Sequence, residues 1–275
     1  MTPFAVAQGL ALRHPGHAVC ENLSFTVPGS VRLLSICGPS GSGKTTLLRA
    51  LAGLHAPSGG SLRVLGEPVA GTRRSLGYLP QSLSLFPWKT VRENVEFGLL
   101  CQGVAGAERR ERADAMLADL GLAAWADSAV AKLSGGMRQR AAIARALVTQ
   151  PEAVLLDEPF SALDFRATEQ LCSLLSRLAA QASRFVVVTH DLRAAAFLSD
   201  AVVMLTHEAQ ATCIAIDAPP HPRPPACFTG DAHHRAMQAL LLAARGPHNA
   251  PEADHRRFHG HAGSEIGGET GHASA

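Results

Sequence analysis

A glycine-rich stretch near the N-terminus constrains the fold more than any other feature of the sequence. It consists of Gly38, Pro39, Ser40, Gly41, Ser42, Gly43, Lys44 and Thr45, and Thr46 follows it. The apolar residues 31–37 before it suit a buried strand, and residues 45–53 suit a helix that ends at a glycine. A strand, a glycine loop and a helix in this order let backbone N–H groups surround phosphate oxygens. In such a loop Lys44 contacts the β- and γ-phosphates and the Thr45 hydroxyl contacts Mg²⁺.

A second pair of chemical groups follows an apolar run at residues 153–156. Asp157 and Glu158 come directly after this run. A carboxylate at the end of a strand can hold Mg²⁺ through water, which is the role we predict for Asp157. Glu158 is placed to act as the general base for an attacking water. Together with the glycine loop, these residues predict a P-loop NTPase that uses Mg²⁺, and they do not define its class further.

The order of apolar runs predicts an α/β fold. Residues 153–157, 185–189 and 201–205 are further candidates for buried strands, and residues 165–182 carry leucines at helical spacing. Strands that alternate with helices indicate a mainly parallel sheet covered on both faces. We expect a helical insert at about residues 82–150, with helices near 107–120 and 136–148. Residues 4–6 and 23–27 suit a small antiparallel sheet.

The decisive segment is residues 133–140, with the sequence LSGGMRQR. Here the chain resembles the ATPase subunits of ABC transporters, whose family motif is LSGGQ. Ser134 can cap a helix while Gly135 and Gly136 leave backbone N–H groups free for an anion. In this family the site contacts the γ-phosphate of ATP held by the opposite subunit, so the resemblance implies a homodimer. Met137 replaces the usual glutamine, which removes a polar side chain but leaves the backbone site intact.

Other family motifs follow in the family's order, and the resemblance covers about residues 4–207. Gln81 matches the glutamine that reaches Mg²⁺ and the water, and Asp164 in the sequence SALD matches the loop that crosses the dimer interface. His190 matches the histidine that contacts the γ-phosphate. The family stacks adenine on an aromatic residue, for which this chain offers His14. An equally good interpretation makes His14 a plain turn residue. The catalytic set implied by the resemblance is therefore Lys44, Gln81, Glu158 and His190.

The segment at residues 85–95, LFPWKTVRENV, narrows the resemblance. It is similar to the importers of nitrate, sulfonates and taurine, and to some importers of thiamine precursors. Phe86 and Trp88 suit a groove that receives a short helix of the permease, or, with equal weight, they close the core of the helical insert. The resemblance implies separate permease subunits in the membrane, a periplasmic substrate-binding protein and a location on the cytoplasmic face of the inner membrane.

Composition divides the chain into an ATPase domain at residues 1–216 and a tail at 217–275. The tail is rich in proline, glycine and histidine, so we expect it to be largely disordered, with one helix near 232–245. Clustered imidazoles can bind transition metals, which leaves the ATPase of a metal-ion importer as an alternative. The tail histidines are His221, His233, His234, His248, His255, His259, His261 and His272.

Charge, length and cysteine content argue against several other classes of protein. The net charge is +2 over 275 residues, so no strong attraction to nucleic acid follows, and we expect no nucleic-acid partner. A DNA-repair ATPase would carry a long coiled coil or a zinc module between the two glycine sites, and this chain carries neither. The six cysteines form no CxxC pair and suit reduced thiols. The N-terminus does not read as a secretion signal, and no apolar run approaches the roughly 18 residues of a membrane span.

Overall fold

A six-stranded sheet forms the centre of the molecule. The computed structural model describes residues 2–71, 75–181, 183–206 and 210–245. The strands are β3 Leu33–Cys37, β6 Leu76–Leu79, β7 Ala153–Asp157, β8 Arg184–Val188, β9 Ala201–Leu205 and β10 Ala211–Ala215, in the order β10-β9-β3-β8-β7-β6. All neighbouring strands are parallel except β10, which pairs antiparallel with β9. The predicted mainly parallel core is therefore confirmed.

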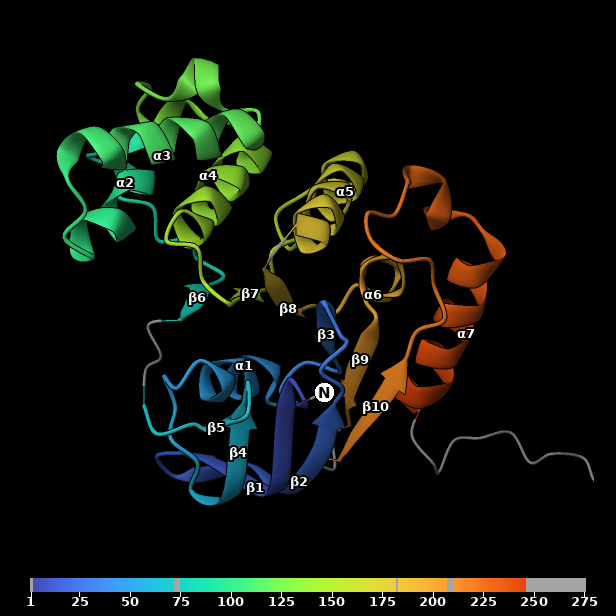
Figure 1. Cartoon of the computed structure of the whole chain (residues 1–275). Coiled ribbons are helices and arrows are strands. Elements are labelled where there is room, and N and C mark those ends of the chain that lie inside the picture. The colour runs from blue at the N-terminus through green and yellow to red at the C-terminus, as the bar shows by residue number, and fades with distance from the viewer. Residues whose placement is uncertain (1, 72–74, 182, 207–209, 246–275) are drawn as a thin grey trace, which may run out of the picture.

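Helices and a second sheet cover the two faces of this core. The second sheet is antiparallel and comprises β1 Ala5–His14, β2 His17–Val27, β4 Gly59–Val64 and β5 Glu67–Pro68 in the order β2-β1-β4-β5. It packs on one side together with α1 Lys44–Leu51. Helices α5 Phe165–Gln181 and α6 Leu192–Leu198 lie on the other side (Figure 1). The small antiparallel sheet was expected only at residues 4–6 and 23–27, and its strands are longer.

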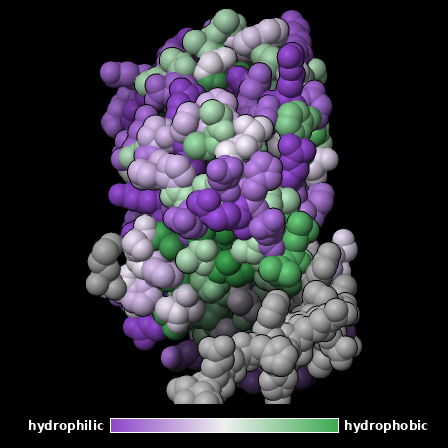
Figure 2. Space-filling view, turned by 90° about the vertical axis from the view of Figure 1, so that its right-hand side faces the viewer, coloured by the Kyte–Doolittle hydropathy of each residue, from purple (hydrophilic) through white to green (hydrophobic). Residues whose placement is uncertain are grey.

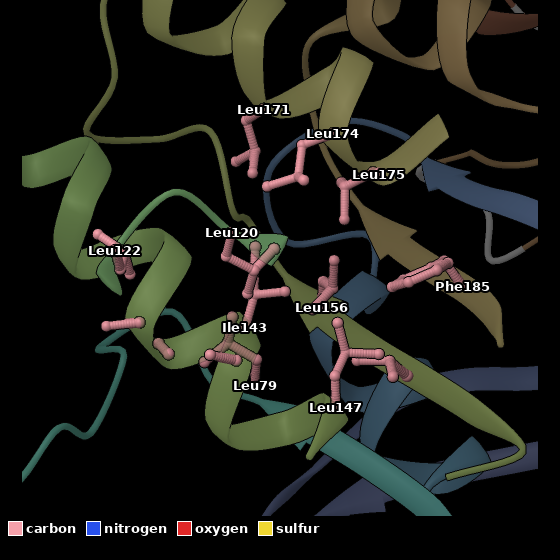
Figure 3. Close-up of a cluster of buried hydrophobic side chains, with 14 of the residues drawn as sticks. Leu79, Leu120, Leu122, Ile143, Leu147, Leu156, Leu171, Leu174, Leu175 and Phe185 are labelled. Carbon is pink, nitrogen blue, oxygen red and sulfur yellow. The ribbon is translucent and has the colours of Figure 1, made fainter. Parts of the chain in front are cut away.

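The predicted helical insert is present. It contains α2 Val91–Cys101, α3 Gly106–Asp119, the 3₁₀ turns η1 Ala123–Trp125 and η2 Val130–Lys132, and α4 Gly135–Leu147. Its apolar side chains meet those of α5 and the core sheet in one buried cluster, in which Ile143 of α4, Leu156 of β7 and Leu175 of α5 are fully buried (Figure 3). This shared core joins the insert to the central sheet.

Beyond residue 216 we expected a largely disordered tail with one helix near residues 232–245, and the structure contains that helix, packed on the core. The turn η3 Pro225–Phe228 and the helix α7 Asp231–Arg245 lie beside α6. The ring of Phe228 stacks on Phe197 of α6, with ring centroids 3.8 Å apart and an interplanar angle of 6°. This contact supplies the buried apolar surface that the proline-rich sequence lacks by itself. Residues 246–275 lie outside the described residues.

One face of the molecule carries α7, and Figure 2 views it from that side. Hydrophobic residues gather over the lower part of this face. Leu241 and Leu242 of α7 are both exposed. Within the described ranges, no helix is both long enough and apolar enough to cross a bilayer.

Candidate nucleotide-binding site

The glycine loop is shaped by contacts that admit no larger residue at its key positions. Gly43 has φ +88°, and a Cβ added there would lie 2.6 Å from Cγ1 of Val19. Gly38 has φ +152°, and its Cβ would lie 2.6 Å from the carbonyl oxygen of Leu205. The Lys44 side chain lies across the loop, and its ammonium donates to the carbonyl oxygens of Gly38 at 3.0 Å and Pro39 at 2.8 Å. The loop thus encloses a positive charge in front of the first turn of α1.

The carboxyl end of β7 meets this loop. The Thr45 hydroxyl donates to Oδ1 of Asp157 at 2.8 Å, and the Asp157 residue is 3% exposed. The Tyr78 hydroxyl, from β6, donates to the other carboxylate oxygen at 3.4 Å. Burial raises the pKa of Tyr78, so this hydroxyl keeps its proton and acts as a donor. Carboxyl ends of parallel strands share one edge of a sheet, which explains why residues so distant in sequence meet here.

Glu158 and His190 come together at the same edge. Glu158 has φ +49°, and its N–H donates to the carbonyl oxygen of Val188 in β8 at 3.0 Å. Nδ1 of His190 lies 2.9 Å from Oε2 of Glu158. The next residue, Asp191, caps α6 by accepting from the N–H groups of Arg193 and Ala194. The backbone of both side chains is therefore fixed by the sheet and by the start of a helix.

One cavity of about 440 Å³ unites most of the predicted residues. It is lined by His14, His17, Val19, Ser40, Gly41, Gly43, Lys44, Thr45, Thr46, Gln81, Glu158 and His190. All four predicted catalytic residues border it, as does the proposed adenine-binding residue. Asp157 reaches the cavity through its bond with Thr45. The other predicted loop residues, Gly38, Pro39 and Ser42, belong to the same loop.

His14 lies in a small cluster of imidazoles at one end of this cavity. Its Nε2 is 3.2 Å from the Thr46 hydroxyl oxygen. Its ring centroid is 5.6 Å from that of His17 and 5.0 Å from that of His55, with an edge-to-face angle of 63° to His55. Sequence reasoning missed His17, Val19 and His55. The antiparallel pairing of His14 with His17 across the β1–β2 turn is the signal that could have found the first of them.

A separate group of predicted residues lies away from the cavity. The Ser134 hydroxyl accepts from the N–H of Met137 and caps α4. Oδ1 of Asp164 accepts from the N–H of Ala167 at 2.8 Å at the start of α5. A Cβ on Gly135 would lie 3.9 Å from the carbonyl oxygen of Ala162, so the two segments are adjacent. Neither Ser134, Gly135, Gly136 nor Asp164 lines the cavity described above.

The two aromatic residues after Gln81, Phe86 and Trp88, differ in exposure. Phe86 is half-buried and packs against the half-buried Phe97 of α2, with ring centroids 4.7 Å apart. Trp88 is 77% exposed, and its ring is 5.6 Å from that of Phe86. Phe86 thus packs on the surface of α2 without entering the buried core of the insert, whereas Trp88 offers an apolar surface to the outside.

Three of the tail histidines fall within the described residues. Nδ1 of His221 lies 2.8 Å from the Ser176 hydroxyl oxygen, and His233 is buried beside Phe228. His234 lies with Nδ1 3.2 Å from the Gly230 carbonyl oxygen. No group of three or more His, Cys, Asp or Glu side chains that could hold a metal ion occurs in the part of the chain that the structure describes.

The fold and this site define a P-loop ATPase. Residues 20–161 match the family model described as ABC transporter. A putative ATP-binding protein of Brucella abortus (strain 9-941) is 38% identical over 209 residues, covering 74% of this chain and 79% of the relative. The taurine import ATP-binding protein TauB of Pseudomonas entomophila is 44% identical over 199 residues, covering 71% and 76%. The chain therefore belongs to the ABC transporter family, as one of its ATP-binding and ATP-hydrolysing subunits.

A solved structure agrees with this assignment. The ATP-binding cassette MJ0796, seen as a dimer in a post-hydrolysis state with ADP and phosphate, superposes with a TM-score of 0.68. The two sequences are 29% identical, and the match covers 78% of this chain and 100% of that chain. The predicted family, fold class and enzymatic class are all confirmed by these comparisons.

Proposed function

We propose that this chain powers the import of a small anion, of the sulfonate or taurine class, by hydrolysing ATP against a separate permease. The observation that carries the proposal is the single cavity in which Lys44, Gln81, Glu158 and His190 converge. The cargo class is supported by the taurine import proteins among the relatives, of which that of Pseudomonas syringae pv. tomato is 40% identical over 201 residues. The ATPase subunit itself has no need to touch the cargo.

The phosphate end of the cavity fits a triphosphate and Mg²⁺. A hydroxyl and a carboxylate oxygen, from Thr45 and Asp157, lie 2.8 Å apart, and Gln81 adds an amide oxygen on the same cavity. Oxygen donors of this kind are the ligands that Mg²⁺ prefers. Bound there, Mg²⁺ would neutralise charge that develops on the β- and γ-phosphate oxygens. The Lys44 ammonium exchanges its two carbonyl partners for these oxygens when ATP enters.

Hydrolysis is assigned to the pair at the ends of β7 and β8. The Glu158 carboxylate accepts the proton of the attacking water, and His190 orients that water and donates a hydrogen bond to the γ-phosphate. Their mutual contact of 2.9 Å holds both groups at one point of the cavity wall. Gln81, on the loop after β6, completes the ring of polar groups around the water.

The second anion site requires a second copy of the chain. Ser134, Gly135 and Gly136 form a helix N-terminus that does not border the cavity of their own chain, and Asp164 lies beside them on the adjacent loop. A homodimer places this helix end against the γ-phosphate in the partner's cavity. The dimeric state of MJ0796 supports the same arrangement for this chain. Two ATP molecules are then enclosed between two copies.

The remaining partners follow from the importer role. Integral-membrane permease subunits dock on the helical insert, where the exposed Trp88 ring offers an apolar anchor. A periplasmic binding protein delivers the anion to the permease from the other side, and nucleic acid has no part in the cycle. The chain is then peripheral, on the cytoplasmic face of the inner membrane.

A substitution at Glu158 tests the hydrolytic mechanism. Glu158→Gln keeps the size of the side chain but removes the base, so we expect ATP turnover to fall by about 10²–10⁴-fold while ATP binding persists. The variant should form a stable dimer with ATP, measured by size-exclusion chromatography, and the unsubstituted chain should not accumulate it. Rapid turnover by the variant would remove Glu158 from the role of base.

Purification from the native cell tests the partners and the cargo class. Affinity purification of the tagged chain in mild detergent, followed by mass spectrometry, should recover a multi-span permease. Uptake of radiolabelled taurine or another sulfonate should then be lost on deletion of the chain. Recovery of DNA-repair factors in place of a permease would contradict the transport role, and unchanged uptake of every sulfonate tried would contradict the cargo class alone.

A further inference from the structure

The loop between β6 and α2 contains two successive residues in a strained conformation. Leu83 has φ +58° and Ser84 has φ +49°, and neither is glycine. Non-glycine residues in the left-handed region carry a cost in free energy, and they persist only where surrounding contacts impose that conformation. Gln81, which lines the ATP cavity, stands two residues before this turn. The contacts that impose the turn therefore bear on the position of Gln81.

Arg145, near the end of α4, supplies two of these contacts. Its Nη1 donates to the Ser84 carbonyl oxygen at 2.6 Å, and its Nη2 donates to the Leu83 carbonyl oxygen at 2.8 Å. Its guanidinium carbon lies 5.6 Å from the ring centroid of Phe86. Within the described ranges Arg145 forms no ion pair with a carboxylate, and burial lowers its pKa. A half-buried cation that serves two carbonyl oxygens and one ring fixes the turn by its planar fork.

The other end of the turn is held by α2. The fully buried Asn94 accepts from the N–H of Phe86 at 2.7 Å and donates to its carbonyl oxygen at 3.1 Å. Residues 83–86 are thus attached to the helical insert through both α2 and α4. The strand β6, by contrast, belongs to the core sheet and ends at Leu79. Residues 80–82, with Gln81 at their centre, form the short link between the insert and the core.

We propose that Arg145 is a positioning residue for ATP hydrolysis, which clamps the strained Leu83–Ser84 turn to α4 and thereby sets Gln81 in the cavity. The proposal rests on the role given to Gln81 above. Because α4 begins at the Ser134 site, this helix connects the clamp to the surface that meets the ATP of a second copy. A movement of the helical insert then moves Gln81 with it.

The first test compares alanine variants of two arginines that bond to carbonyl oxygens of the insert. Arg145→Ala in the full chain should lower kcat for ATP by about tenfold, because Gln81 is then no longer held in its position in the cavity. The KM for ATP should change by less than about twofold, because Arg145 does not touch the phosphate loop. Arg145→Lys should recover part of the rate. Arg112 is the control, since it bonds to the Val148 carbonyl oxygen at 3.1 Å and lies outside the loop.

Arg112→Ala should leave kcat within about twofold of the unsubstituted chain. An equal loss in the two alanine variants would assign the effect to general loosening of the insert and overturn the clamp. A rise in KM without a fall in kcat in Arg145→Ala would also overturn it, since Arg145 would then act on ATP binding.

A glycine variant tests the role of strain. Ser84→Gly removes the conformational cost at φ +49°, so the turn depends less on Arg145 and the alanine variant should lose only about threefold in kcat in this background. Gln150→Gly is the matched control, because Gln150 has φ +54° just after α4 and lies outside the loop. If Arg145→Ala lowers kcat tenfold in both the Ser84→Gly and the Gln150→Gly backgrounds, then Arg145 does not act by holding the strained turn.

Hydrogen exchange separates failure of the clamp from failure of the ATPase proposal. In Arg145→Ala the amides of residues 81–86 should exchange at least about tenfold faster, and in Arg112→Ala they should not. If the unsubstituted chain does not hydrolyse ATP but the two variants still differ in exchange, the ATPase mechanism is contradicted and the clamp is supported. If Arg145→Ala hydrolyses ATP and its amides 81–86 exchange at the rate of the unsubstituted chain, the clamp is contradicted and the ATPase mechanism is supported.

Discussion

At the scale of single residues, imidazoles gather beside the cavity at the place where we predict that adenine binds. His14 offers a ring next to the cavity, Thr46 lies on its Nε2, and His55 packs edge-on against it. Neighbours on two sides fix the plane of the His14 ring. A fixed plane can stack on a purine without hydrogen bonds to the base, because every base has a π-face. This geometry favours the adenine-stacking interpretation of His14 over that of a plain turn residue.

A binding measurement decides between these interpretations. His14→Ala should weaken ATP binding by about 1–3 kcal/mol, the usual loss of one stacked base, whereas His14→Phe should bind ATP at least as tightly as the native chain. Inorganic tripolyphosphate lacks a base and serves as the control ligand in the same calorimetric titrations. If His14→Ala weakens tripolyphosphate as much as ATP, then His14 acts through Thr46 on the phosphate end.

At the scale of elements, two N-caps of the helical insert separate stability from function. Ser134 caps α4, and Thr90 caps α2 with a capping box in which Glu93 bonds back to the Thr90 N–H. The two caps are chemically alike, but only the Ser134 cap belongs to the proposed second anion site. Replacing each hydroxyl therefore removes the same kind of local bond from two helices with different roles.

Alanine at each cap should lower the free energy of unfolding by about 1 kcal/mol. Ser134→Ala should also reduce ATP turnover, because in the proposed dimer the hydroxyl and the first turn of α4 contact the γ-phosphate bound by the partner. Thr90→Ala should leave turnover close to native. The readouts are urea unfolding by circular dichroism and phosphate release at saturating ATP. Equal turnover in the two variants would mean that the Ser134 hydroxyl is a cap and nothing more.

The elements also show what the sequence predicts and what it leaves out. The strands β3, β7, β8 and β9 consist mainly of consecutive apolar residues, as expected for buried parallel strands, and these apolar runs predict them. Strand β10 has two exposed and three half-buried residues, so its weak pattern gave no signal. The β1–β4 pairing is set by contacts across more than 50 residues, such as Gln8 with Ser61. Such pairings depend on tertiary packing and cannot be read from local spacing.

The candidate site was more predictable than the fold around it. Lys44, Thr45 and Asp157 stand at the ends of strands or the start of a helix, and the topology of a parallel sheet brings such positions together. His55 and the Arg145 contacts could not be predicted, because they join loops whose paths the sequence does not specify. Sequence signals thus predict which groups meet at the cavity, whereas the contacts that surround those groups emerge from packing.

At the scale of the whole molecule, the segment after β10 is tied into the ATPase core by a buried arginine. The Arg223 side chain is 1% exposed and donates to the carbonyl oxygens of Phe197 at 2.6 Å and Ser199 at 3.0 Å, and to Asp200 at 2.8 Å. Oδ2 of Asp200 in turn accepts from the N–H of Leu33 at 3.0 Å at the start of β3. One carboxylate therefore links the C-terminal segment to the strand that leads into the phosphate loop.

Removal of this arginine should destabilise the whole fold. Arg223→Met removes one cationic partner of the half-buried Asp200 and the buried donor to the Phe197 and Ser199 carbonyl oxygens, so the free energy of unfolding should fall by about 3 kcal/mol at pH 7. Arg13→Met is the control: it breaks an ion pair with Glu21 whose side chains are both 60% exposed, and it should change stability by less than about 1 kcal/mol. Equal midpoints of urea unfolding for the two variants would show that Arg223 does not anchor the segment.

The same contacts of Asp200 make the stability of the fold depend on pH in the acid range. Burial by itself raises the pKa of Asp200, but the hydrogen bonds from His221 and from the N–H groups of Leu33 and Arg32 outweigh it and lower the pKa below its ordinary value. The ionised carboxylate is thus favoured in the folded chain, and its contribution to stability is complete above about pH 4, the pKa of an unfolded aspartate. That contribution is lost as the pH falls through the lowered pKa. Asp200→Asn should therefore unfold at lower urea than the native chain at pH 6, and the difference should shrink towards pH 3. A difference that stays constant over this range would show that the charge of Asp200 does not hold the C-terminal segment to β3.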